Sequence, residues 1–301
     1  MAKAMMIILA AVTAHETKPS ALVGAPPLAL VSSGLDPVSG GALSVSTLVD
    51  QKYAHLIANF AHHMHAALPT VRYNVLTIDA AAQRQCQSFA GPSFKMTCLA
   101  AFPVETRNKT FVRRPSDKNH YADPVFLYKT IITRELAIHT NFGGGSVLLD
   151  ITAFVLSEAC WAELLHQNAD FVVTVSNGMK SDFSRKHGLV PNTGLTLSRS
   201  GSLPLINDWL AVHRRVGGPQ QPALMRALST ILLHRSKGTN GPSAMGLWPT
   251  GTTTVALQFL PEPRWARAPK NISNACLFHP FVPGHNTHEE SFRAVGLWYG
   301  Q

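Results

Sequence analysis

The sequence predicts an α/β protein with a mostly parallel central sheet and helices on both faces. Three observations favour this fold class: segments rich in β-branched residues alternate with amphipathic helical segments, polar residues follow the apolar strands directly, and Gly and Pro separate the elements. The chain has 301 residues, of which 46% are hydrophobic and 14% charged, with 21 Gly and 20 Pro. This composition is typical of a globular core with many loops, and not of a helical bundle or a disordered chain.

The first part of the chain has an apolar segment followed by a polar one. Residues 1–20 contain an apolar run that resembles a signal peptide, and Met5–Val12 within it is equally typical of a buried β-strand. The run is much shorter than the roughly 20 apolar residues that cross a bilayer, so we expect no membrane span there. Residues 21–53 are rich in Gly, Pro and Ser and predict an irregular lead-in, apart from an apolar island at Pro27–Ser32. The main domain is expected over 54–301.

Helices and strands alternate through the central part of the chain. Helices are indicated by apolar residues that recur at three- and four-residue steps, and strands by short runs of β-branched and aromatic residues. In chain order we expect a helix over 48–68, a strand over 71–79, a helix over 123–140, a strand over 146–150, a helix over 159–167 and a strand over 170–176. This alternation is typical of βαβ units, in which helices join parallel strands and cover the sheet.

Polar residues stand where the predicted strands end. Asp79, Asp150 and the turn Ser176-Asn177-Gly178 each follow an apolar run. Ligands of α/β sheets bind beyond the carboxyl ends of the strands, and a carboxylate there can ligate a hard divalent cation that holds a diphosphate. The alternative is that Asp150 caps a following helix, because Asp and Thr are good N-cap residues.

The charge of the chain favours phosphate-bearing partners. Its formal net charge is +9 and its pI is about 9.6. The basic residues occur as scattered pairs, with no run of five or more and no basic stretch interleaved with aromatic residues. We therefore expect nucleotide-like partners and no nucleic acid.

Four cysteines are present, and none has the CxxC spacing of zinc and redox sites. They are Cys86, Cys98, Cys160 and Cys276. Two disulfides and four buried thiols are both compatible with their spacing. Two Asn-x-Ser/Thr sequons, at Asn108 and Asn271, would carry glycans only in the secretory pathway.

The order of the segments, taken together, resembles that of one enzyme family. The matching segments are Asn74–Asp79, a helix with Lys129, the strand with Asp150-x-Thr152, Asn168–Ser176, Pro191–Leu195, Leu205–Leu210, His279, Gly284 and Gly296–Trp298. This order resembles the nucleotide-diphospho-sugar transferase family of GT-A glycosyltransferases, which includes plant cell-wall arabinosyl- and xylosyltransferase-like enzymes. The resemblance implies a Rossmann-like GT-A fold, hexosyl- or pentosyltransferase activity, a nucleotide sugar donor such as a UDP-sugar, and a glycan or glycoprotein acceptor. It also implies residence in the Golgi or the secretory-pathway lumen.

The resemblance implies a metal site at the end of the apolar strand. In the family an Asp-x-Asp motif binds Mn²⁺ and the diphosphate of the donor, and Asp150 matches its first position. Thr152 stands where the second Asp is expected, and a hydroxyl is a poorer ligand for a hard cation. His279 matches a histidine that completes the site, with Gly284 close behind it. The implied ligands of Mn²⁺, or of another divalent cation, are Asp150, Thr152 and His279.

Further residues are implied to bind the donor or to act in catalysis. Asp79 and Lys129 are the remaining donor-binding candidates, and Lys129 matches a basic position that could hold phosphate. Asn192 and Gly194 resemble the Asn-Thr-Gly stretch of the family, although such a stretch can also be an ordinary turn. Gln221 is the nearest match to an Asp-Gln pair and completes the catalytic candidates.

Two other functions remain open from the sequence. Because Thr152 removes the second carboxylate, the first alternative is a non-catalytic GT-A-like domain that binds a nucleotide or glycan. The second is another Rossmann-like nucleotide-binding enzyme such as a methyltransferase, since βαβ alternation alone does not distinguish these classes. The sequence has no GxGxxG after an early strand and no GxSxG, which counts against dinucleotide-binding enzymes and serine hydrolases.

Overall fold

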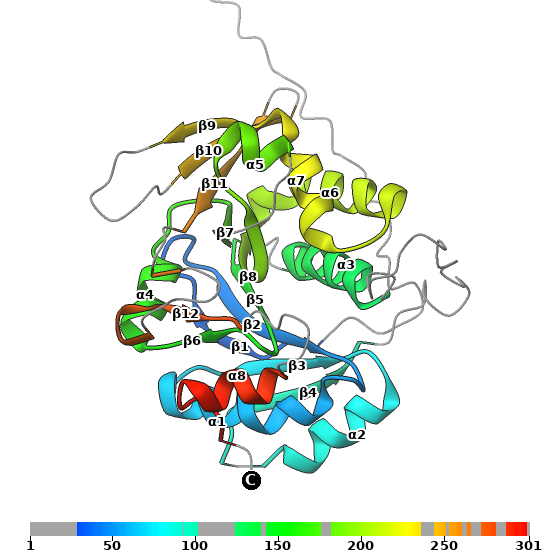
Figure 1. The fold of residues 1–301 in the computed structure, drawn as a ribbon, viewed down its shortest axis with the longest axis vertical. Coiled ribbons are helices and arrows are strands. Elements are labelled where there is room, and N and C mark those ends of the chain that lie inside the picture. Colours follow the sequence, from blue (N-terminus) through cyan, green and yellow to red (C-terminus); the bar gives the residue numbers. More distant parts are fainter. Residues whose placement is uncertain are drawn as a thin grey trace, which may run out of the picture.

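A computed structural model describes a central sheet flanked by helices (Figure 1). The residues it describes are 29–91, 93–101, 124–139, 143–175, 182–235, 244–250, 253–260, 264–265, 272–280 and 287–299. Some predicted features lie outside the described residues, namely Met5–Val12, the two sequon asparagines, the Ser176–Gly178 turn and Gly284.

Ten described strands form the main sheet. Their order is β4-β3-β2-β5-β8-β7-β11-β10-β9, with β1 paired to β2 outside this path. Their bounds are β1 Ser32–Leu35, β2 Ala42–Val49, β3 Tyr73–Thr77, β4 Met96–Ala100, β5 Gly145–Asp150, β7 Phe171–Val175, β8 Pro191–Arg199, β9 Leu232–Arg235, β10 Ala244–Thr250 and β11 Thr253–Phe259. Two short strands, β6 Phe154–Val155 and β12 Leu277–Phe278, form a separate antiparallel pair.

The sheet is mostly parallel, as predicted. Strands β4, β3, β2 and β5 pair in parallel, and β7 pairs in parallel with β11. Strand β8 lies antiparallel between β5 and β7, so β5 and β7 run in the same direction. Strands β1 and β10 are also antiparallel to their neighbours. The carboxyl ends of the central parallel strands therefore meet at one edge of the sheet.

Helices cover both faces of the sheet. The α-helices are α1 Ile57–Ala67, α2 Ala80–Phe89, α3 Pro124–His139, α4 Glu158–Leu165, α5 Asp182–His187, α6 Leu203–Val216, α7 Gln220–Ala227 and α8 His288–Ala294. Four short 3-10 helices are also described: η1 Ala54–Leu56, η2 Ser200–Ser202, η3 Leu228–Thr230 and η4 Ile272–Asn274. The helices predicted over 123–140 and 159–167 correspond to α3 and α4.

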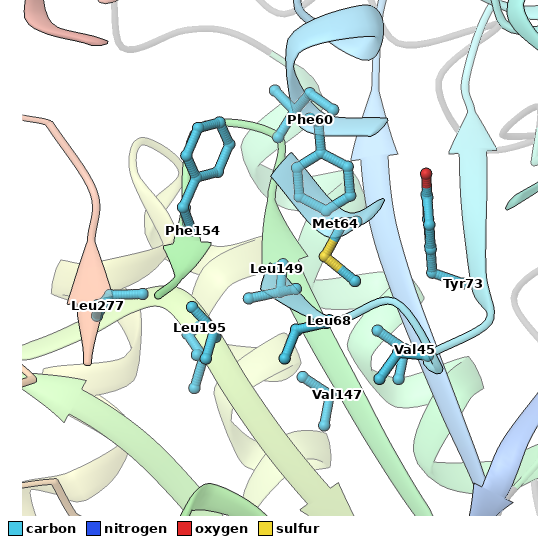
Figure 2. Packing of buried hydrophobic residues seen from close by; sticks show 14 of the residues in the cluster. Val45, Phe60, Met64, Leu68, Tyr73, Val147, Leu149, Phe154, Leu195 and Leu277 are labelled. Atoms are coloured by element: carbon cyan, nitrogen blue, oxygen red, sulfur yellow. The ribbon is translucent and has the colours of Figure 1, made fainter. Parts of the chain in front are cut away.

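Side-chain alternation along the strands divides the core between the two faces. On one face, Val147 and Leu149 of β5 pack with residues of α1, α2, α4 and α8, and Figure 2 shows Phe60 and Met64 of α1 near Leu149. On the other face, Leu148 packs with α3, and a neighbouring cluster joins β7, β10 and β11 to α5, α6 and α7. Burial of each such side chain stabilises the fold by roughly 1.5–3 kcal/mol.

The expectation of an irregular lead-in over 21–53 is wrong for its second half. Strand β2 lies in this range, is buried over most of its length and pairs with β1, β3 and β5. Its composition is misleading because Ser44 and Ser46 alternate with apolar residues and are themselves buried. The Ser44 and Ser146 hydroxyls are 3.0 Å apart and hydrogen-bond across the β2–β5 pair. The helix predicted over 48–68 consequently begins later, after β2 has ended.

The cysteines form two disulfides. Cys86 of α2 bonds to Cys98 of β4, and Cys160 of α4 bonds to Cys276, which precedes β12. Of the two possibilities open from the sequence, the structure has the disulfide-bonded form. Within the described ranges, no helix combines the length and the apolar composition that a membrane crossing requires.

Candidate functional site

Asp150 is the last residue of β5 and lies at the carboxyl edge of the parallel strands. Asp150 lies two residues after Leu148, so both side chains point to the face of the sheet that α3 covers. The side chain of Asp150 is 29% exposed. The alternative role as a helix cap is wrong. The chain turns after Asp150, with the Ala153 N–H donating to its carbonyl at 2.8 Å, and Ser157 caps α4 instead.

Lys129 of α3 reaches across to this carboxylate. Its ammonium group donates to Asp150 Oδ1 and, at 2.5 Å, to the backbone carbonyl of Thr193. Lys129 is only 3% exposed, and a buried ammonium requires both an opposite charge and hydrogen-bond acceptors. This one side chain therefore joins α3, the end of β5 and the beginning of β8.

His279 approaches the same carboxylate from the C-terminal part of the chain. Its Nε2 lies 3.5 Å from Asp150 Oδ2, and the residue is 5% exposed. The segment that carries it is held by the pairing of β12 with β6 and by the nearby Cys160–Cys276 disulfide. Because β6 closely follows Asp150 in the chain, these contacts fix His279 beside the end of β5.

Gly194 provides the space that His279 occupies. A Cβ built on Gly194 would lie well under 3.0 Å from Nδ1 and Cε1 of the His279 ring, so a larger residue does not fit. The Gly194 N–H donates to Asn192 Oδ1 at 2.8 Å. Asn192 is fully buried, and among the described residues its Nδ2 has no hydrogen-bond partner. Gly194 therefore borders both the imidazole and an amide whose Nδ2 is unpaired within the described ranges.

A bulge in β8 places these groups. Val173 and Thr174 are adjacent in β7, but their partners in β8 are Thr196 and Asn192, so extra residues of β8 lie between them. Thr193 and Gly194 fall in this irregular stretch, where the Thr193 carbonyl accepts from Lys129. The alternative of an ordinary turn at Asn192-Thr193-Gly194 is wrong, because the segment is a buried strand.

The structure therefore brings together five of the predicted residues: Lys129, Asp150, Asn192, Gly194 and His279. Thr152 lies in the turn that follows β5 and is 6% exposed. Asp79 lies two strands away at the same edge and caps α2, accepting from the N–H groups of Ala82 at 2.8 Å and Gln51 at 2.6 Å. Gln221 is in the first turn of α7, and no contact found among the described residues connects it to Asp150.

Sequence reasoning missed two parts of the site. One is the Thr193 carbonyl, which accepts from Lys129. Its only signal in the sequence is Gly194, because a glycine inside a strand can mark a bulge. The other is the disulfide and strand pairing that hold His279, because cysteine spacing does not reveal which cysteines pair.

The described residues offer a divalent cation a poor set of ligands at this site. Within the described parts of the chain, no group of three or more His, Cys, Asp or Glu side chains is placed to hold a metal ion. Asp150 is engaged by the Lys129 ammonium, and Thr152 offers a neutral hydroxyl where a second carboxylate was expected. The Mn²⁺ ion implied by the sequence resemblance thus stays a prediction, and no step below depends on it.

The chain is similar to several solved glycosyltransferase structures over part of its length. A galactosyltransferase, LgtC, in complex with donor and acceptor sugar analogs, covers 62% of this chain and 70% of its own, with 15% identity and a TM-score of 0.37. GlyE from Streptococcus pneumoniae TIGR4 covers 62% of this chain and 43% of its own, with 12% identity and a TM-score of 0.37. For a glycosyltransferase involved in the glycosylation of the major capsid of PBCV-1, the match covers 58% of this chain and 68% of the other, with 10% identity and a TM-score of 0.30. No family model and no curated protein matches the chain.

Proposed function

We propose that this chain is a GT-A-type glycosyltransferase that moves a sugar from a nucleotide diphosphate donor, preferably a UDP-sugar, to a hydroxyl of a glycan or glycoprotein. The observation that carries the proposal is the convergence of Lys129, Asp150, Gly194 and His279 at the carboxyl end of β5. Ligands of α/β sheets bind at this edge. The segment order that resembles the nucleotide-diphospho-sugar transferases supports the same assignment.

Sugar transfer from such a donor requires that the protein stabilise the leaving diphosphate. The bond from the anomeric carbon to the diphosphate oxygen breaks, the acceptor oxygen bonds to that carbon, and the acceptor hydroxyl releases its proton to water. Negative charge grows on the diphosphate, so fixed positive charge and oriented N–H donors lower the barrier. Lys129 is paired with Asp150 and so offsets the repulsion between that carboxylate and the diphosphate. The His279 ring and the Asn192 amide supply nitrogen donors beside Gly194. The net charge of +9 favours the approach of an anionic donor.

Release of nucleoside diphosphate tests this proposal. The full chain is incubated with a panel of UDP- and GDP-sugars, with Mn²⁺ or with a chelator, and release of UDP or GDP is followed with the natural protein and with Asp150→Asn. Asp182→Asn is the matched control, since Asp182 is 96% exposed on α5. We expect release from at least one donor, a loss of tenfold or more in Asp150→Asn, and no change in Asp182→Asn. If no donor gave nucleoside diphosphate release and none bound, the glycosyltransferase assignment would be wrong.

A binding domain without turnover is the second candidate function. The specific observation that favours it is Thr152, which stands where the resembled family has a metal-binding carboxylate. This candidate predicts that titration calorimetry detects UDP or GDP binding while no sugar donor is turned over. Turnover in the experiment above would exclude it.

We also propose residence in the Golgi or the secretory-pathway lumen. The two disulfides support this location, because disulfides form and persist in oxidising compartments. Fractionation of cells that express the tagged full-length protein, followed by protease protection with and without detergent, tests it. Protection only in intact vesicles is expected, and digestion without detergent would contradict it.

A further inference from the structure

We propose that Lys129 takes the place of a divalent cation, so that the site binds the diphosphate of its donor without metal. This inference rests on the proposed function and specifies how the same site recognises its ligand. Lys129 is the positioning residue in this scheme, because it acts by holding and neutralising Asp150.

The first argument is that Asp150 already has a cation. The Lys129 ammonium contacts Oδ1 of Asp150 and is also held by the Thr193 carbonyl at 2.5 Å. A metal ion bound to Oδ1 would have to displace this ammonium. A displaced ammonium at a position that is 3% exposed would lose its counter-charge in the interior, which is strongly unfavourable.

The second argument concerns the charge that a diphosphate meets. Two carboxylates of an Asp-x-Asp motif carry two negative charges and repel a diphosphate unless a divalent cation lies between them. In this chain Thr152 removes one of those charges, and Lys129 neutralises the other. The motif region is therefore neutral without a metal, and the usual electrostatic need for one is absent.

The third argument is that other donors complete the cluster. The His279 ring lies 3.5 Å from Asp150 Oδ2, and the buried Asn192 Nδ2 has no hydrogen-bond partner among the described residues. Asp150 keeps 29% of its side chain exposed, so a ligand can reach the group that Lys129 and His279 flank. Nitrogen donors of this kind suit phosphate oxygens.

Calorimetric titration with UDP, and in parallel with GDP, tests the inference. The full-length protein is stripped of metal and titrated in EDTA and in Mn²⁺. We expect the affinity of the natural protein to agree within about twofold between the two conditions. In Lys129→Met we expect metal-free affinity to fall tenfold or more, and Mn²⁺ to restore part of it, because the freed Asp150 carboxylate becomes a metal ligand. Lys95→Met is the matched control, since Lys95 is exposed, and should behave like the natural protein.

A second variant keeps the test decisive if Lys129→Met does not fold, which thermal unfolding would reveal. Thr152→Asp restores the second carboxylate, so metal-free affinity should fall and Mn²⁺ should raise it. Nucleotide binding by the natural protein that disappears in EDTA and returns with Mn²⁺ would overturn this inference and leave the proposed function intact. Absence of UDP and GDP binding in both conditions would instead overturn the proposed function, and this inference with it.

Discussion

The ring of His279 occupies the space beside the Gly194 α-carbon in which every other amino acid carries its Cβ. The two residues belong to segments far apart in the chain, β8 and the stretch after β12. Their contact decides where the imidazole lies relative to Asp150, so the size of residue 194 controls the geometry of the site.

We expect Gly194→Ala to displace His279 and to lower stability. Overpacking of a buried position typically costs about 1–3 kcal/mol, and urea unfolding measures it. Nucleoside diphosphate release should fall together with stability. Gly91→Ala is the control, because a Cβ there meets only the Phe89 carbonyl at 3.9 Å, and it should leave both quantities unchanged. Native stability and turnover in Gly194→Ala would contradict this prediction, because they would show that the His279 ring can shift away from the new Cβ without cost.

The second prediction concerns the two disulfides. Removal of Cys160–Cys276, whose cysteines are separated by 116 residues, should cost about 4–5 kcal/mol by loop-closure entropy, against about 3 kcal/mol for Cys86–Cys98 with a separation of 12. Double Cys→Ala variants compared by denaturant unfolding check the order. Only loss of the 160–276 bond should also weaken nucleotide binding, since it anchors the His279 segment. An equal effect of both pairs on binding would contradict this role.

The third prediction concerns the buried ion pair of Asp36 with Arg199. Arg199 Nε donates to Asp36 Oδ2 at 2.6 Å, and its NH groups also donate to the carbonyls of Leu165, Gln167 and Ala169. Burial would raise the pKa of Asp36, but its hydrogen bonds from Arg199, Ser39 and Val38 hold that pKa below its ordinary value.

Asp36→Ala leaves the Arg199 guanidinium without its counter-charge, and we expect a loss of about 3–5 kcal/mol in the free energy of unfolding. Glu289→Ala, which removes an exposed pair with Arg293 on α8, should cost about 0.5 kcal/mol or less. Equal losses in the two variants, measured by urea unfolding, would show that burial of the first pair is unimportant.

The fourth prediction is a pH dependence that originates in His63 of α1. Its Nε2 hydrogen-bonds with the Val155 carbonyl at 2.9 Å, and its ring stacks on Phe154 with centroids 4.2 Å apart. Burial lowers the pKa of His63 from 6.5 to about 4, although the Val155 hydrogen bond opposes the shift. The unfolded chain therefore binds this proton more tightly than the folded chain does.

The contribution of His63 to stability is complete above pH 6.5 and is lost as the pH falls towards 4. The loss should amount to about 3 kcal/mol over this interval. In His63→Gln the free energy of unfolding should decline less between pH 7 and pH 4 by about that amount. His65→Gln, at an exposed position of the same helix, should keep the full decline. Identical pH profiles for His63→Gln and the natural protein would refute the assignment.

How much of this molecule the sequence predicts depends on how each segment is buried. Strand β5 is predictable because Val147, Leu148 and Leu149 are apolar on both faces and Asp150 marks the end. Strand β2 is not predictable from the sequence, because its buried serines resemble those of a loop. The bulge of β8 is not predictable either, because Asn-Thr-Gly is typical of turns and becomes a strand only through its pairing with β5 and β7.

The sequence names residues that the structure brings together, but it does not predict how they contact one another. Lys129, Asp150, Gly194 and His279 could be named from the segment order, yet nothing local to Asp150 indicates that Lys129 neutralises it. That contact depends on where α3 crosses the sheet and on the Thr193 carbonyl, which lies in the bulge of β8 and accepts from Lys129. Asp79 was a sound strand-end candidate, but its carboxylate is used to begin α2.

The site is built from four segments that lie far apart in the sequence: α3, β5, β8 and the stretch after β12. The last of these, which carries His279, is anchored by the Cys160–Cys276 disulfide. Long loops must close before such contacts form, and the entropy cost of that closure slows folding. During synthesis the strands of the main sheet are all made before the segment that carries His279. Leu277, Phe278 and Phe292 of this last part of the chain also belong to the core on one face of the sheet. If the proposed function holds, the C-terminal part thus completes the core and the site together, and a chain that ends before residue 277 should be inactive.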